Sequence, residues 1–150
     1  MKKKVAALIG FVLAIELVIS SGAQAGVYAD DLARCMVSST SSKDKIALVR
    51  WMFAGIALHP DVASLSNVTD AMRDEINRNT ATLVERLVTQ SCRKQSNEAF
   101  RYEGKTAFEQ GFGVLGKVAM NELMSNENVS VGFRAYAKYM DKLKLEAIGK

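Results

Sequence analysis

The sequence predicts an all-α fold, a compact bundle of about five helices around a central hydrophobic helix at residues 43–58, with one disulfide. Along most of the chain, apolar residues recur every three or four positions, which is the spacing of one helix face. No segment has the alternating apolar and polar residues that are typical of a half-buried strand. From Ile46 to Leu58 only Arg50 and Gly55 are not apolar, which favours a helix surrounded by other helices.

Local signals define both ends of this central helix. Ser41 is followed three residues later by Asp44, a capping box in which Asp replaces the usual Glu. Pro60 disfavours helical geometry at His59 and ends the helix there. The apolar run is too short to span a bilayer, so we expect a buried core helix.

The first 25 residues are typical of a cleaved secretory signal peptide. Three lysines precede an apolar run from Val5 to Ile15, and small residues lead to Ala23-Gln24-Ala25, after which we place the cleavage. Glu16 is unusual in such a signal, so an uncleaved N-terminal anchor is the alternative. We expect a periplasmic or secreted protein whose mature form, residues 26–150, is a single α-helical domain without an integral membrane span.

The charge balance argues against a nucleic-acid partner. The full chain has 20 Lys and Arg against 16 Asp and Glu. Without the three N-terminal lysines and Glu16, 17 basic residues face 15 acidic ones, a net charge of +2. A small, mixed charge of this kind gives no support to binding of DNA or RNA.

Two cysteines, Cys35 and Cys92, are the only ones in the chain. An even pair in an exported protein predicts one structural disulfide. Their spacing does not fit a C-x-x-C redox motif, and free thiols or intermolecular pairing are the alternatives. The bridge would close a long loop and stabilise the fold by roughly 4 kcal/mol in the chain-entropy model.

The remaining helices follow from the same periodicity. The third helix, capped by Asn67 or Thr69, is expected to be one long amphipathic helix. The fourth begins at about Glu98 or Lys105, and the last carries an apolar stripe that we expect to close the bundle. The predicted ranges are 28–39, about 67–94, about 98–123 and about 130–147.

The segment Gly111-Phe-Gly113-Val-Leu-Gly116 matches the letters of the G-x-G-x-x-G dinucleotide motif. That motif requires a preceding strand, whereas the residues before Gly111 are typical of a helix. We therefore expect no nucleotide site here. The glycines instead suggest the close approach of another backbone, such as the helix that carries Trp51, or a break in the helix.

Arg50 and His59 are the two polar candidates on the central helix. A buried Arg50 needs a carboxylate partner, for which Glu109 and Glu122 are the first candidates. The alternative is an arginine that faces a cleft and binds an anionic ligand or a partner's carboxylate. His59, the only histidine, is expected to bond the free carbonyls at the helix end, with catalysis as the alternative.

No cofactor or metal ligand set is predicted. Met120 and Met124 lie one turn apart, and thioethers bind Cu(I), but methionines at helical spacing are usually core residues.

The last helix combines aromatic and basic residues, among them Tyr136, Lys138 and Lys142. A basic amphipathic helix of this kind can lie on an anionic membrane surface or bind an acidic partner. We expect it to close the bundle while its lysines stay in water.

Export, one disulfide and the lack of a recognisable catalytic motif favour a non-enzymatic protein-binding module. Inhibitors, immunity-type proteins and accessory proteins belong to this class, and its partner would be another exported protein. The first alternative is a hydrolase that uses His59 or a carboxylate pair. The second is a helical carrier of a small apolar ligand or of copper.

Overall fold

The computed structural model describes residues 26–148, so the predicted signal peptide lies outside the described residues. In this part of the chain every regular element is helical, and the all-α prediction is confirmed. The first four α-helices are α1 (Val27–Ser38), α2 (Ser42–Ile56), α3 (Pro60–Ala63) and α4 (Asp70–Arg86). A π-helical turn, η1 (Leu87–Ser91), then leads to α5 (Arg93–Glu103) and α6 (Lys105–Met124). The chain ends in α7 (Glu127–Arg134), the 3-10 helix η2 (Ala135–Tyr139) and α8 (Lys142–Glu146).

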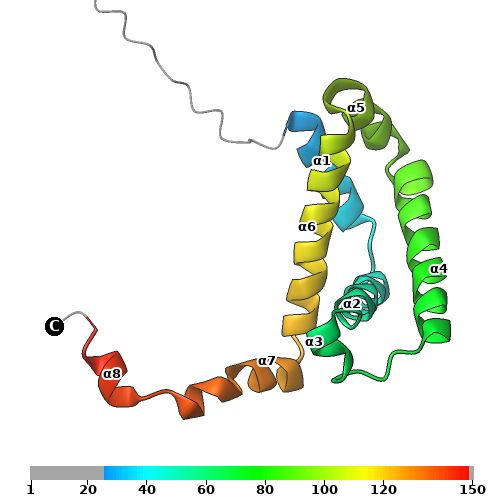
Figure 1. Cartoon of the computed structure of the whole chain (residues 1–150). Coiled ribbons are helices and arrows are strands. Elements are labelled where there is room, and N and C mark those ends of the chain that lie inside the picture. The colour runs from blue at the N-terminus through cyan, green and yellow to red at the C-terminus, as the bar shows by residue number, and fades with distance from the viewer. Residues whose placement is uncertain (1–25, 149–150) are drawn as a thin grey trace, which may run out of the picture.

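The long helix α6 is the common partner of the bundle. It packs against α1 over much of its length, and its later turns contact α2 (Figure 1). Helix α4 packs against α2, and α5 packs against α1 and α6. None of the helices among residues 26–148 is long and apolar enough to cross a bilayer.

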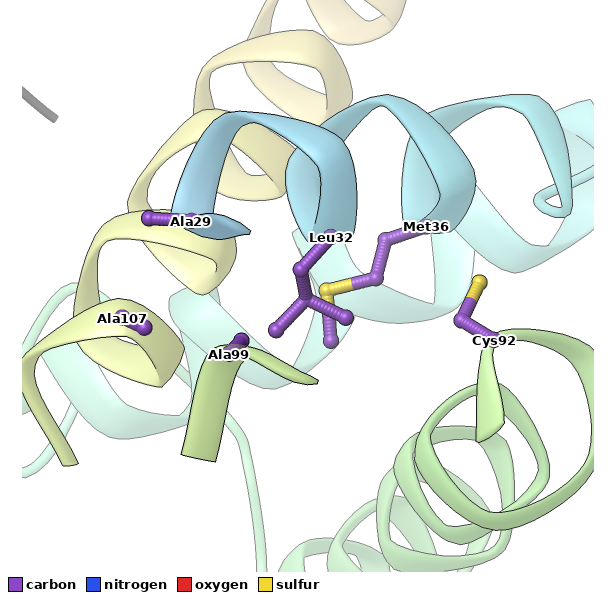
Figure 2. Close-up of a cluster of buried hydrophobic side chains, with 6 residues drawn as sticks. All are labelled: Ala29, Leu32, Met36, Cys92, Ala99 and Ala107. Atoms are coloured by element: carbon purple, nitrogen blue, oxygen red, sulfur yellow. The ribbon is translucent and has the colours of Figure 1, made fainter. Parts of the chain in front are cut away.

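The predicted disulfide is present between Cys35 of α1 and Cys92, the residue after η1. Cys92 belongs to a buried cluster formed by α1, α5 and the start of α6, which consists of Ala29, Leu32, Met36, Cys92, Ala99 and Ala107. Figure 2 shows Leu32 and Met36 of α1 side by side at the centre of this cluster. The disulfide therefore links α1 to the residue after η1 at the edge of a packed core.

A second buried cluster joins α2, α4, η1 and α6 through Leu48, Leu83, Leu87, Leu115 and Ala119. The aromatic ring of Phe112 packs against both clusters. Because Phe112 lies in the middle of α6, that helix connects the two halves of the core.

The expectation that residues 43–58 form a buried core helix is wrong in one respect. The helix forms as predicted, but of its side chains only Leu48 and Ala54 are buried, while Trp51 is 46% and Leu58, just beyond its end, is 60% exposed. The most buried helix is α1, which has neighbours on more sides. Within the described residues, α2 packs mainly against α4 and α6, so part of its apolar surface remains in water.

The long third helix is helical close to its predicted end at about residue 94, because η1 continues α4 as far as Ser91. Helix α4 begins after its predicted cap, Thr69, but ends at Arg86, and the backbone N–H of Cys92 bonds the carbonyl of Leu87 in the wider π geometry. A new helix then begins at Arg93. Gly104, with φ of +70°, separates α5 from α6, a conformation that glycine adopts without strain.

The single terminal helix expected at residues 130–147 is divided into α7, η2 and α8, and it does not close the bundle. Helix α7 contacts the end of α6, and the chain then leads away from the bundle (Figure 1). Every side chain described between residues 131 and 148 is exposed. Of its aromatic residues, Phe133 lies beside α6, whereas Tyr136 and Tyr139 are exposed beyond the bundle.

Candidate functional site

The candidate site is an apolar groove of about 490 Å³ between α2, α4, α6 and α7. Eleven side chains line it, of which only Arg50 is charged; the others are Val49, Met52, Phe53, Ile56, Val68, Met72, Ile76, Met120, Leu123 and Phe133. Several of them are partly exposed, so the groove is open to solvent. Below we call these residues the α2–α4 groove.

Helix α2 supplies one wall through Val49, Met52, Phe53 and Ile56. These residues stand at the i, i+3, i+4 and i+7 positions of one helix face. Leu48 and Ala54, which are buried, lie on other faces. Because α2 is apolar on nearly every side from Ile46 onward, one face can fill the core while another lines the groove.

Helix α4 supplies the opposite wall through Met72 and Ile76, with Val68 just before its start. Arg73 holds this wall against α2. Its guanidinium donates hydrogen bonds to the carbonyls of Ala54, in the last turn of α2, and of Val68. A cation at a helix C-terminus is favourable because the free carbonyls carry partial negative charge.

The end of the groove is formed by Met120 and Leu123 of α6 and by Phe133 of α7. Phe133 is 60% exposed and lies where the chain leaves the bundle. A second cavity of about 380 Å³ adjoins the groove through the shared residues Met52 and Ile56. Trp51 and Leu58 line this second cavity.

Arg50 does not form the buried ion pair that the sequence suggested. Its predicted partners are engaged elsewhere, Glu122 by Lys45 at 3.3 Å and Glu109 by Lys105 at 3.6 Å. The reason is geometric, because Lys45 and Leu48 lie on the face of α2 toward α6, whereas Arg50 lies beside Ile76 and Thr80 of α4.

Among residues 26–148, no carboxylate lies within ion-pair distance of the Arg50 guanidinium, and the side chain is exposed. Of the two alternatives, the arginine that faces a cleft is the one that the arrangement favours. A guanidinium at the edge of an apolar groove can donate two parallel hydrogen bonds to one carboxylate.

His59 is exposed and caps the N-terminus of α3. Its Nδ1 accepts a hydrogen bond from the backbone N–H of Asp61 at 3.3 Å, and the Asp61 carboxylate lies 3.8 Å from the same nitrogen. The sequence predicted that His59 bonds the free carbonyls at the end of the central helix. In the structure its side chain instead bonds an amide at the start of α3. His59 does not line the groove.

The predicted contact residues Tyr136, Lys138 and Lys142 lie beyond the groove, in the exposed segment that follows α7. The Lys138 ammonium lies over the ring of Tyr139, 4.8 Å from its centroid. The Cys35–Cys92 bridge is at the other end of the bundle, in the cluster around α1 and α5. The structure therefore brings only Arg50, of all the predicted contact residues, to the groove.

The glycine segment of α6 is continuous helix. Gly111 is buried against α1, where a Cβ atom would meet the side chains of Leu32 and Met36 at 3.5 Å, an ordinary packing distance, so the predicted close approach of another backbone is not present there. The expected approach by the Trp51 helix is wrong. Gly113 and Gly116 face open space and have no such contact.

The usual metal-ligating side chains are scattered in the part of the chain that the structure describes. No group of three or more His, Cys, Asp or Glu side chains comes together there. Met120 shares the groove with Met52 and Met72, whereas Met124 does not line it. Flexible thioethers adapt well to irregular apolar ligands.

One carboxylate, that of Asp44 in the first turn of α2, has a perturbed pKa. Burial of Asp44 favours its neutral form, but hydrogen bonds from the backbone N–H and hydroxyl of Ser41, together with the charge of Arg86, outweigh it and lower the pKa. The Arg86 guanidinium lies 3.1 Å from Asp44, so this pair joins the start of α2 to the end of α4. The predicted capping box of Ser41 and Asp44 is confirmed.

Sequence reasoning did not identify the groove itself. Val68, just before α4, and Met72 and Ile76 within it share one helix face, which the sequence periodicity predicts to be part of the core. Phe133 was likewise expected to close the bundle. The groove could have been predicted from α2, because this helix has more apolar side chains than α4 and α6 can bury.

No protein-family model matches the chain, and no curated protein and no solved structure is significantly similar to it. The site must therefore be interpreted from its own chemistry.

Proposed function

We propose that this chain is a small exported binding protein whose α2–α4 groove holds an anionic amphiphile, a molecule with an apolar tail and a carboxylate head. The observation that carries the proposal is the position of Arg50, an exposed cation without an ion-pair partner at an otherwise apolar groove. The apolar side chains would bind the tail, and the guanidinium would bind the head.

The size and lining of the groove support a small molecule. Ligand sites in proteins usually measure about 300–1,000 Å³ and combine many apolar side chains with a few polar groups that fix orientation. The groove, at about 490 Å³ with one charged residue among eleven, is of this kind. Three methionines, Met52, Met72 and Met120, would let it adapt to tails of different shape.

Export is part of the proposal. The N-terminal sequence predicts a signal peptide, and the disulfide supports an oxidising compartment such as the periplasm or the outside of the cell. A long apolar tail is poorly soluble in water, so a binding protein in such a compartment would carry it in a shielded form.

Fluorescence titration tests the proposal, because Trp51 is the only tryptophan and lies in the cavity next to the groove. Dodecanoate, added below its micelle concentration, should bind to one saturable site. Arg50→Gln should weaken dodecanoate binding roughly tenfold, as expected for loss of a hydrogen bond to a charged group, and should leave dodecanol binding nearly unchanged. Met120→Glu should abolish binding of both, since it places a charge in the apolar groove.

The matched control is Arg101→Gln, which removes a cation from α5, outside the groove. It should bind dodecanoate as the unmodified protein does. Circular dichroism should show unchanged helix content in all three variants. Dodecanoate binding that is absent, or that Arg50→Gln and Arg101→Gln reduce equally, would rule out the proposal.

A protein partner is the second candidate, favoured by the exposed side chains of Trp51 and Leu58 beside the groove. Large exposed apolar groups that lie together are typical of interaction surfaces. Crosslinking from a photoreactive residue at position 58 in the native compartment would reveal such a partner. A crosslinked species that persists when the groove is blocked by Met120→Glu would favour this candidate over the amphiphile.

A further inference from the structure

The C-terminal arm, residues 131–150, is exposed to solvent over its described part, residues 131–148. It starts within α7 and includes η2 and α8, and its described side chains are all exposed. Tyr136 is 66% and Tyr139 81% exposed. Figure 1 shows this segment leading away from the foot of α6.

The arm differs from the bundle in charge. Residues 131–150 contain five Lys and Arg against two Asp and Glu, a net charge of +3. Residues 26–130 contain twelve basic against thirteen acidic residues, a net charge of −1. The positive charge of the mature chain is thus concentrated in its last twenty residues.

The arm also combines two kinds of side chain. Phe133, Tyr136, Tyr139 and Met140 are apolar or amphipathic, and Arg134, Lys138, Lys142 and Lys144 are basic. At helical spacing, Phe133, Tyr136 and Met140 share one face, while Arg134, Lys138 and Lys142 share another. Basic helices with an aromatic face lie in the interface of anionic bilayers, where the rings enter the headgroup layer and the lysines meet the phosphates.

We propose that the C-terminal arm binds the surface of an anionic lipid bilayer. The charge distribution favours lipid over a second copy of the chain, because two arms repel each other and a bundle of net charge −1 attracts an arm only weakly. A bilayer with anionic headgroups provides both an opposite charge and an apolar layer. This inference does not depend on the groove, although Phe133 belongs to both.

Binding would place the open groove at the lipid surface, since Phe133 of the groove is also the first aromatic residue of the arm. Residues 135–148, now divided between η2 and α8, would join into a longer helix, because an amphipathic segment gains helix when its apolar face is covered. Both consequences can be measured.

Vesicle sedimentation tests the inference. The protein is expressed with its own N-terminal segment and purified in its processed form, then mixed with vesicles of phosphatidylcholine alone or of equal parts phosphatidylcholine and phosphatidylglycerol. It should bind the anionic vesicles only, with increased helix content in circular dichroism, and salt should weaken the binding. The double variant Lys138→Glu with Lys142→Glu should bind at least tenfold more weakly, because each basic residue at an anionic surface strengthens binding roughly fivefold.

The matched control is Lys43→Glu with Lys117→Glu, two exposed lysines of α2 and α6. It changes the total charge by the same amount and should keep most of the binding. Tyr136→Ala with Tyr139→Ala should reduce binding without a change of charge. The inference is overturned if binding is equal on neutral and anionic vesicles, if the two lysine variants lose binding equally, or if the lipid-free protein is a dimer that the arm variants dissociate.

Discussion

Two carboxylates join helices that are far apart in the sequence. Asp44 receives hydrogen bonds from Ser41 at 2.8 and 2.9 Å and pairs with Arg86 of α4. Glu103, the last residue of α5, accepts hydrogen bonds from the backbone N–H groups of Tyr28 and Ala29 at 3.0 Å each. Each side chain thus satisfies the free amides at one helix start and connects that start to another element.

Asp44 should make stability dependent on pH in the acid range. Its folded pKa lies below the ordinary value of 3.8, so the stabilisation is complete above that value and is lost as the pH falls through the folded pKa. Chemical unfolding measured from neutral pH to below 3.8 should show this loss, and Asp44→Asn should flatten the curve there. Asp30→Asn, an exposed carboxylate of α1, is the control and should leave the slope unchanged. An unaltered slope in Asp44→Asn would contradict the assignment.

The short-range signals at this scale were readable from the sequence. The capping box at Ser41 and the cap at Thr69 depend on residues three positions apart, and both are present. The environment of Arg50 was not readable, because it depends on which face of α2 meets α6. Glu103 was also missed, since nothing local indicates that its carboxylate reaches α1 from 74 and 75 positions away.

At the scale of the element, α1 shows how a short helix becomes the most buried one. Gly26, its first flanking residue, has no side chain that could cap it. Glu103 supplies the cap from α5, and the rings of Tyr28 and Tyr102 stack beside it with centroids 4.6 Å apart. On its other side α1 packs closely on Gly111 of α6.

Removal of the Glu103 carboxylate should therefore loosen the start of α1. Glu103→Ala leaves two amides without partners, and loss of a capping side chain costs about 1–2 kcal/mol of unfolding free energy. Hydrogen exchange should speed up at Tyr28 and Ala29 before the rest of α1. Glu109→Ala, which removes an exposed carboxylate paired with Lys105, should change neither quantity. Equal effects of the two variants would show that the carboxylate of Glu103 has no specific role.

At the scale of the whole molecule, the sequence predicted the fold class and the disulfide. It predicted less well which helices are buried by their neighbours. Periodicity identifies helices, and two cysteines behind a predicted signal peptide are enough to predict the bridge. The burial of a helix depends on how many other helices pack against it, and sequence periodicity does not reveal that number. For this reason α2 and the last segment, both rich in apolar residues, were expected inside and are partly or fully exposed.

The disulfide should act on the whole molecule, because it encloses both walls of the groove. The segment between Cys35 and Cys92 contains α2, α3 and α4, and closure of a loop with 57 positions between its ends restricts the unfolded chain. The chain-entropy model gives about 4 kcal/mol for a loop of this size.

The double variant Cys35→Ser with Cys92→Ser should therefore unfold at a lower denaturant concentration than the oxidised protein. Reduction should bring the unmodified protein close to the variant, since both then have an unrestricted unfolded state. The variant itself should not respond to reductant. The same midpoint for oxidised protein and variant would show that the bridge adds no stability, and the packing of Leu32, Met36 and Cys92 would then hold this end of the bundle alone.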